Sequence, residues 1–218
     1  MNNHFKYYFL QQTEQHLPSK ISKNFSSFQA DERNNRGETL IMSVVKYEPD
    51  LANQIRHINL LVRYGCDPSE PETRQNRTPL MVACLMRNER IARHLISLNA
   101  NLLIADKMGN TALMYAVLYS NSSLVNFISD TLFRKSCIEA FRAKNLLGET
   151  AEILARKNEK FLLSMLIKKY RLKLVKELNN CVQWNSSQAQ KYSSWNLFFI
   201  LFKVIYIFIK LEEFFLFF

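Results

Sequence analysis

The sequence contains few glycines, and no two of the four lie close together. A loop that cradles phosphate groups needs closely spaced glycines, so we expect no nucleotide site of that kind. Proline is also scarce, with five in 218 residues. An all-β chain needs frequent turns, which glycine and proline supply, so this composition favours a helical chain.

The sequence also lacks the usual patterns of metal centres and catalytic sites. Its cysteines are scattered without a CxxC pair, and its histidines form no HExxH or triad-like group. We therefore predict no enzyme activity, no metal site and no cofactor. Scattered cysteines are typical of a reduced, intracellular protein, and the first ten residues lack a secretory signal, so we expect a cytoplasmic location. The residues concerned are Cys66, Cys84, Cys137, Cys181, His4, His16, His57 and His94.

The positive charge is concentrated in one segment. Of the net charge of +10, residues 155–194 contribute +7, from nine Lys and Arg against two Asp and Glu, whereas residues 37–154 are nearly neutral. A nucleic-acid footprint spread over the whole domain would need a basic central region. We therefore do not expect nucleic acid to be the main partner.

A short pattern occurs twice in the middle of the chain. TPLMVA (78–83) is echoed by TALMYA (111–116), and weaker copies begin at Gly37 and Gly148. The aligned threonines are 39, 33 and 39 residues apart, which indicates a unit of about 33 residues with an insertion in two intervals. A period in this range is typical of stacked-repeat architectures.

Each copy predicts a turn followed by two helices. Gly109 and Asn76 tolerate the positive φ of a tight turn, the threonine that follows suits a helix N-cap, and the alanine of the motif lets a neighbouring unit approach. A second helix is expected over residues 91–98, closed by Asn99 and Ala100.

These residues resemble the ankyrin-repeat family over about residues 37 to 170. TPLMVA and TALMYA match the family's T-P-L-H-x-A, and NANLLIADKMGNTAL (99–113) follows its end-of-repeat hairpin and restart. The resemblance implies an all-α solenoid of stacked helix-turn-helix units with hairpin loops. Methionine replaces the family's histidine at Met42, Met81 and Met114, so we expect apolar packing in place of a turn-stabilising hydrogen bond.

The outer copies depart from the pattern. In the first, a longer turn at Pro49 and Asp50 is expected before a second helix at 58–65. In the third, the second helix is expected to run on through residues 126–141. In the fourth, Glu152 replaces a buried leucine, as suits a terminal cap. We thus predict an extension with a candidate capping helix (1–36), about four repeats with a cap (37–180), a polar linker (181–194) and a hydrophobic tail (195–218).

The resemblance implies a scaffold or adaptor that binds another protein on the concave face of the repeats. The family's variable positions correspond here to Tyr47, Leu85, Met86, Lys107, Met108, Asn110, Leu118 and Tyr119. Large apolar side chains at such positions mark an interaction surface if they are exposed. The alternative is that an extended hairpin, the insertion or an N-terminal helix covers them and they belong to the core.

The basic segment supports a competing hypothesis, in which it binds RNA or an anionic membrane leaflet. The simpler alternative is a solvated helix face. Its residues are Lys168, Lys169, Arg171, Lys173 and Lys176.

The tail WNLFFILFKVIYIFIKLEEFFLFF (195–218) leaves three hypotheses open: a membrane anchor, a helix packed on the repeats, and a non-native translation of AT-rich noncoding sequence. The basic segment on its N-terminal side favours an anchor. The uncharged run that enters it, 192–202, is short of the roughly 20 residues that span a bilayer. The near-exclusive use of residues with AT-rich codons favours the third hypothesis.

Overall fold

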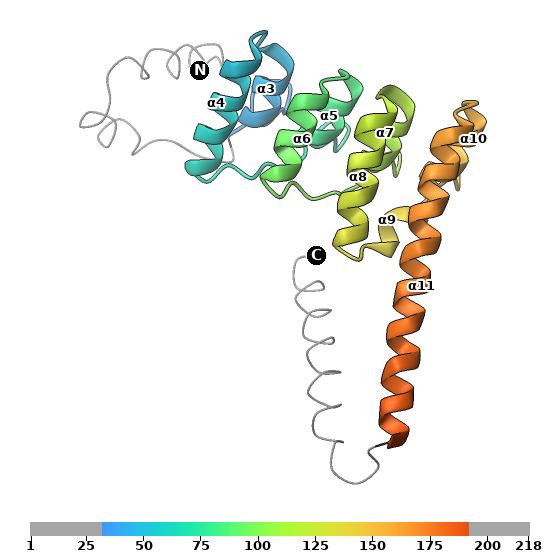
Figure 1. The fold of residues 1–218 in the computed structure, drawn as a ribbon. Coiled ribbons are helices and arrows are strands. Elements are labelled where there is room, and N and C mark those ends of the chain that lie inside the picture. Colours follow the sequence, from blue (N-terminus) through green and yellow to red (C-terminus); the bar gives the residue numbers. More distant parts are fainter. Residues whose placement is uncertain (1–31, 192–218) are drawn as a thin grey trace. The chain divides into compact units, whose positions relative to one another are not determined.

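The computed structural model describes residues 32–191, and the chain divides into two compact units, the first ending at Arg171 and the second beginning at Leu172. The described part of the first unit is an all-α solenoid of helix pairs (Figure 1). Its extended segments form only isolated bridges, Arg33 with Thr39 and Ala105 with Thr111, which close the loops before two of the helix pairs. The predicted all-α repeat fold is confirmed.

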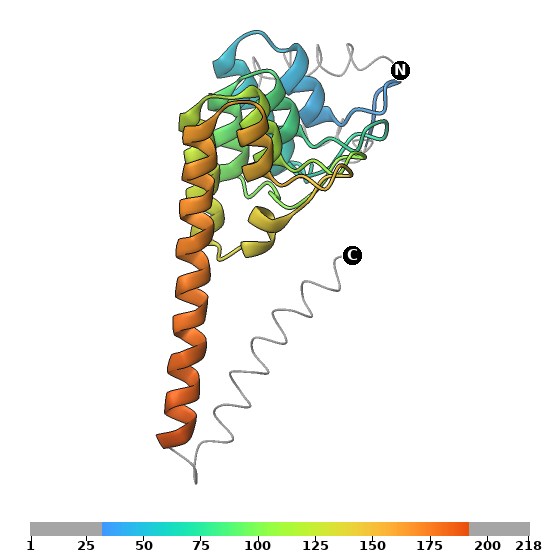
Figure 2. The same ribbon diagram turned by 90° about the vertical axis from the view of Figure 1, so that its right-hand side faces the viewer.

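The helices of the first unit form two layers (Figures 1 and 2). The first helices of the pairs lie side by side, and the second helices cover them. The first layer contains α3 (Leu40–Tyr47), α5 (Pro79–Leu85), α7 (Ala112–Tyr119) and α10 (Ala151–Lys157). The second layer contains α4 (Leu51–Arg63), α6 (Glu89–Ser97) and α8 (Ser122–Arg134), with the short α9 (Ile138–Arg142) after α8.

The helix α11 (Phe161–Lys191) begins in the first unit and continues into the second. Within the first unit, Tyr170 fixes this helix against α8. Its hydroxyl donates to Asn126 Oδ1 at 3.0 Å, and its ring lies 6.0 Å from that of Phe133. Residues 181–191 are helical, whereas we predicted a polar linker at 181–194. The helix runs on because no glycine or proline interrupts the sequence between 161 and 191.

The local turn chemistry of the repeats agrees with the sequence. Thr39, Thr78 and Thr150 are N-caps whose hydroxyls accept from the backbone N–H three residues on, at 3.2 or 3.3 Å. Thr111 occupies the same position, but its buried hydroxyl has no hydrogen-bond partner among the described residues. The turn residue before each cap has the predicted positive φ at Gly37, Asn76, Gly109 and Gly148.

The core lies between the two layers. The alanines of the motif are fully buried, and so are Met42, Met81 and Met114, as expected for residues that replace the family's histidine. One hydrogen bond nevertheless survives in this core, because Met81 Sδ accepts from the N–H of Thr78 at 3.5 Å. The Met81 thioether therefore supplies a weak hydrogen bond to the turn, whereas we expected only apolar packing at this position.

Two predicted helix boundaries are wrong. The second helix of the first repeat starts at Leu51, because Asp50 caps it by accepting from Asn53 N–H at 2.8 Å. The expected insertion therefore lengthens the helix: α4 and α8 have 13 residues each, while α6 has nine. The long helix expected through 126–141 is broken at Ser136, whose φ is +55°. There the N–H of Cys137 bonds back to the carbonyl of Leu132, which ends α8 before α9 begins.

The predicted hydrophobic tail at 195–218 lies outside the described residues, as does nearly all of the predicted extension at 1–36.

Candidate functional site

Residues at the ends of the first-layer helices form a row across the stack. Each lies seven or eight positions after its N-cap threonine, so the row contains one pair per repeat: Lys46 and Tyr47, Leu85 and Met86, Leu118 and Tyr119, Lys157 and Asn158. Because α5 and α7 are direct neighbours, the row brings the two central pairs together. Met86 and Tyr119 are 49 % and 39 % exposed, and Leu85 and Leu118 are half-buried. We call these four residues the central strip.

An ion pair lies at each end of the row. Lys46 Nζ contacts Glu38 Oε1 at 2.6 Å in the first repeat, and Lys157 pairs with Glu149 at the equivalent positions in the fourth. Burial alone would raise the pKa of Glu38, but hydrogen bonds from Lys46 and Asn34 and the Lys46 charge lower it overall. The central strip is thus flanked by charged pairs on both sides.

Tyr47 is exposed, but its hydroxyl is already engaged. Arg36 donates to that hydroxyl at 2.8 Å, and the Arg36 guanidinium lies 6.0 Å from the centre of the Tyr47 ring. Beside them is a pocket of about 310 Å³ between the first two repeats. It is lined by Arg36, Glu38, Lys46, Glu72, Arg74, Gln75, Arg77 and Val82, and we call it the first pocket.

The loop tips are linked by backbone hydrogen bonds. Lys107 N–H donates to Gln75 O at 2.9 Å, and Leu146 N–H donates to Met108 O at 2.8 Å. Lys107 and Met108 are exposed, but Asn110 is half-buried, and its side-chain oxygen accepts from Asn145 at 3.2 Å. Asn110 therefore joins two loops rather than facing outward.

Sequence reasoning missed two exposed leucines at the last loop tip. Leu146 and Leu147 are 72 % and 74 % exposed. In the repeat alignment they correspond to Lys107 and Met108, so carrying the alignment into the fourth copy would have found them.

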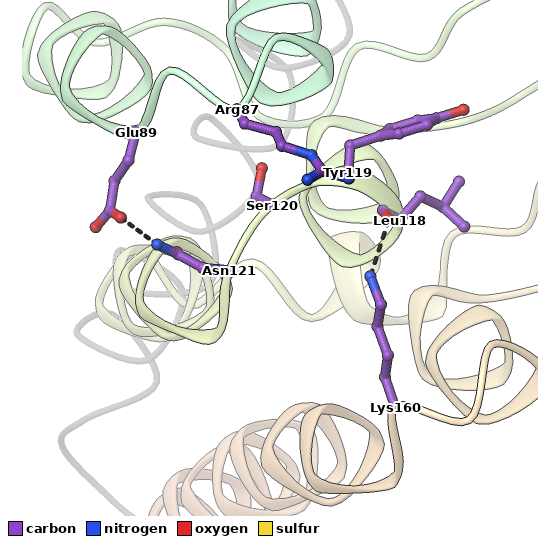
Figure 3. Close-up of a pocket in the computed structure, with 7 residues that line it drawn as sticks. All are labelled: Arg87, Glu89, Leu118, Tyr119, Ser120, Asn121 and Lys160. Atoms are coloured by element: carbon purple, nitrogen blue, oxygen red, sulfur yellow. Dashed lines mark hydrogen bonds between the residues drawn. The ribbon is translucent and has the colours of Figure 1, made fainter.

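A second pocket, of about 320 Å³, lies beside the central strip and is the one shown in Figure 3. Two of its lining residues, Leu118 and Tyr119, belong to the central strip. The others are Arg87, Glu89, Ser120, Asn121 and Lys160, none of which we predicted as site residues. Lys160 reaches it from just before α11, where its ammonium bonds to two carbonyls at the end of α7. We call this the second pocket.

The predicted basic residues do not act alike. In the first unit Lys168 and Lys169 are exposed, whereas Arg171 donates to Glu152 at 3.1 Å. This ion pair explains how Glu152 is accommodated in α10, at the position where a buried leucine was expected. In the second unit Lys173 and Lys176 are exposed. The first unit also exposes apolar side chains at the start of α11, namely Phe161, Leu162 and Met165.

Helix pairs that stack in two layers, joined by loops whose tips are hydrogen-bonded, define a solenoid repeat protein. Residues 41–135 match the family model of ankyrin repeats, in three copies. This part of the chain therefore consists of ankyrin repeats, which are generally protein–protein interaction modules and occur in proteins that are typically non-enzymatic. No curated protein matches the chain significantly.

Residues 32–191 offer neither a metal site nor a membrane-spanning helix. No group of three or more His, Cys, Asp or Glu side chains in this part is placed to hold a metal ion. In the same part, none of the helices combines the length and the apolar character that crossing a bilayer requires.

Proposed function

We propose that this protein is a scaffold or adaptor that binds a partner protein on the concave face of its repeats, with the central strip as the centre of the interface. The observation that carries the proposal is the exposure of Met86 and Tyr119 at equivalent positions of neighbouring repeats. Aromatic residues and methionine are enriched in protein interfaces, and tyrosine is a frequent hot-spot residue.

The arrangement around the strip supports the same proposal. Interfaces commonly have an apolar centre and a polar rim, and here ion pairs at both ends of the row supply the rim. The exposed Met108 and Leu147 on the loop tips extend the available apolar surface. A partner segment that crosses the repeats would meet all of these residues.

A pull-down with a double variant tests this proposal. Leu85→Asp with Tyr119→Asp places two charges in the centre of the proposed interface, where an unpaired buried charge opposes binding. We expect the variant to lose the partners that the intact chain captures, with an unchanged circular dichroism spectrum. The matched control is Ala52→Asp with Ser97→Asp, which adds the same charge on exposed positions of α4 and α6.

The comparison between the two variants decides the outcome. Partners that survive in the folded strip variant would show that the strip is not the interface. Equal losses in both variants would mean that added negative charge, and not the strip, determines capture.

A second candidate function is suggested by the start of α11. Phe161, Leu162 and Met165 are exposed next to Lys168 and Lys169, and apolar side chains beside lysines are what an anionic lipid surface attracts. We infer that this segment contacts acidic membranes peripherally.

Vesicle sedimentation tests the second candidate. Binding to vesicles of phosphatidylcholine with 30 % phosphatidylserine, and not to phosphatidylcholine alone, is expected, and Leu162→Glu should reduce it. The control is Ala52→Glu, an exposed position on α4. Equal binding to the two vesicle types, or to none, removes this candidate.

A further inference from the structure

The second pocket carries positive charge that no neighbouring carboxylate neutralises. Arg87 follows α5 and extends toward Tyr119, while Lys160 enters from the opposite wall (Figure 3). Among residues 32–191, neither side chain forms an ion pair with an acidic residue. The two cations therefore line the same pocket, and neither is paired with a carboxylate of this part of the chain.

Lys160 is held in a fixed position. Its ammonium donates to the carbonyls of Val117 at 2.6 Å and Leu118 at 2.8 Å, at the end of α7. A lysine ammonium has three N–H groups, so one donor remains for another acceptor. Burial lowers the pKa of Lys160 most, and the charge of Arg87 lowers it further because the two cations repel each other. An anion placed between them would relieve this repulsion.

Glu89 is the acidic residue of the pocket lining, but its carboxylate is already engaged. One oxygen accepts from Asn121 at 2.6 Å and the other from Arg93 at 2.8 Å. In Figure 3 the carboxylate turns toward Asn121, on the side away from Lys160. The hydrogen bond from Asn121, and then that from Arg93, lower the pKa of Glu89. This carboxylate thus belongs to its own network and leaves Arg87 and Lys160 available.

The first pocket has the same character. Its lining contains four Lys and Arg side chains and two Glu side chains. Glu38 is bonded to Lys46 at 2.6 Å, and the oxygens of Glu72 accept from the backbone N–H groups of Arg74 and Gln75 at 2.7 and 2.6 Å. Both pockets therefore present an excess of positive charge to a ligand, and their carboxylates are already hydrogen-bonded within the protein.

We propose that the partner segment is acidic, and that it places an Asp or Glu carboxylate in the second pocket, between Arg87 and Lys160. Neighbouring apolar residues of the segment then lie on Leu118 and Tyr119, which line the same pocket. A second acidic residue nearby would face the first pocket. The inference rests on the proposed function, to which it adds the chemical class of the partner.

Selection of short peptides tests this inference. A displayed library of random 12-residue peptides is selected on the full chain, and the selected peptides are synthesised with a fluorescent label. We expect Asp and Glu to be enriched relative to the unselected library. In fluorescence anisotropy, changing the critical carboxylate to its amide should weaken binding about tenfold, because a charge-assisted hydrogen bond is lost.

The critical measurement is a double-mutant cycle. Arg87→Gln removes one cation of the pocket and leaves Lys160, so in this variant the tenfold difference between the carboxylate and amide peptides should become clearly smaller. Arg90→Gln, an exposed position on α6, removes the same charge outside the pocket and should retain the tenfold difference. Lys160→Met, checked for folding by circular dichroism, should reduce the difference as Arg87→Gln does.

The outcomes separate this inference from the function on which it rests. No enrichment of acidic residues, or equal effects of Arg87→Gln and Arg90→Gln, overturns the acidic anchor. In that case, if the selected peptides lose binding to the Leu85→Asp, Tyr119→Asp variant, the proposed interface is still supported and only the acidic anchor is rejected. If no peptide is selected, or none responds to any of these variants, the proposed interface fails and the acidic anchor with it.

Discussion

The two central N-cap threonines offer a sharp test of how the repeats are stabilised. Thr78 and Thr111 are equivalent by position and are both buried. The Thr78 hydroxyl accepts from Met81 N–H at 3.3 Å, whereas the Thr111 hydroxyl has no partner among the described residues. Valine has the same shape as threonine and fits the extended backbone of both sites, so Thr→Val isolates the contribution of each hydroxyl.

The expected effects differ in sign. Thr78→Val removes an N-cap and leaves a buried N–H without its acceptor, which should lower the free energy of unfolding by about 1–2 kcal/mol. Thr111→Val removes a buried hydroxyl that forms no bond, which should leave the free energy unchanged or raise it by about 1 kcal/mol. The two variants should therefore differ by about 2 kcal/mol.

Urea unfolding followed by circular dichroism measures both values, provided that the slope of the transition stays the same in the two variants. A loss at Thr111→Val as large as that at Thr78→Val would refute this reasoning, because it would mean that the Thr111 hydroxyl is bonded in the folded protein.

Three further predictions concern turns, pH and thiols. Gly109→Ala should cost about 2–4 kcal/mol in urea unfolding, because φ is +79° and a Cβ would meet Asn145 Cα at 2.9 Å, whereas Gly148→Ala, with open space, should cost only about 1 kcal/mol. The pKa of Glu38 lies below its usual 4.5, so stability should fall as pH drops below 4.5, less steeply in Glu38→Gln. Burial raises the pKa of the Cys84 thiol to about 12 and raises that of Cys137 as well, but Cys137 is only half-buried, so iodoacetamide at pH 8 should modify Cys137 and spare Cys84 in the native protein.

What could be predicted from the sequence is largely local. The positive φ at Asn76 and the caps at Thr39, Thr78 and Thr150 follow from the preferences of single residues within one turn of chain. The repeat period then predicts stacking, since one helix pair alone cannot bury its apolar face. Met86 and Tyr119, which are exposed, are among the variable positions that the repeat alignment identifies.

What could not be predicted depends on distant contacts or on competing local signals. Lys160 lies 42 residues from the Leu118 carbonyl that it binds, and no local pattern indicates that pairing. The start of α4 was misplaced because Pro49 suggested a long turn, whereas Asp50 directly after it caps the helix. The break at Ser136 lacks the glycine that usually marks such an end, so the sequence favoured one continuous helix.

The extra residues of α4 and α8 indicate where this repeat fold accommodates insertions. The first-layer helices keep seven or eight residues in every repeat, while the second-layer helices vary from nine to 13. Four more residues add about one turn, roughly 6 Å, and nearly preserve the direction in which the side chains point. The additional residues therefore lengthen the second-layer helices, while the first-layer helices keep nearly the same length. Insertions or tags placed in the second layer should be tolerated without disturbing the row that contains Met86 and Tyr119.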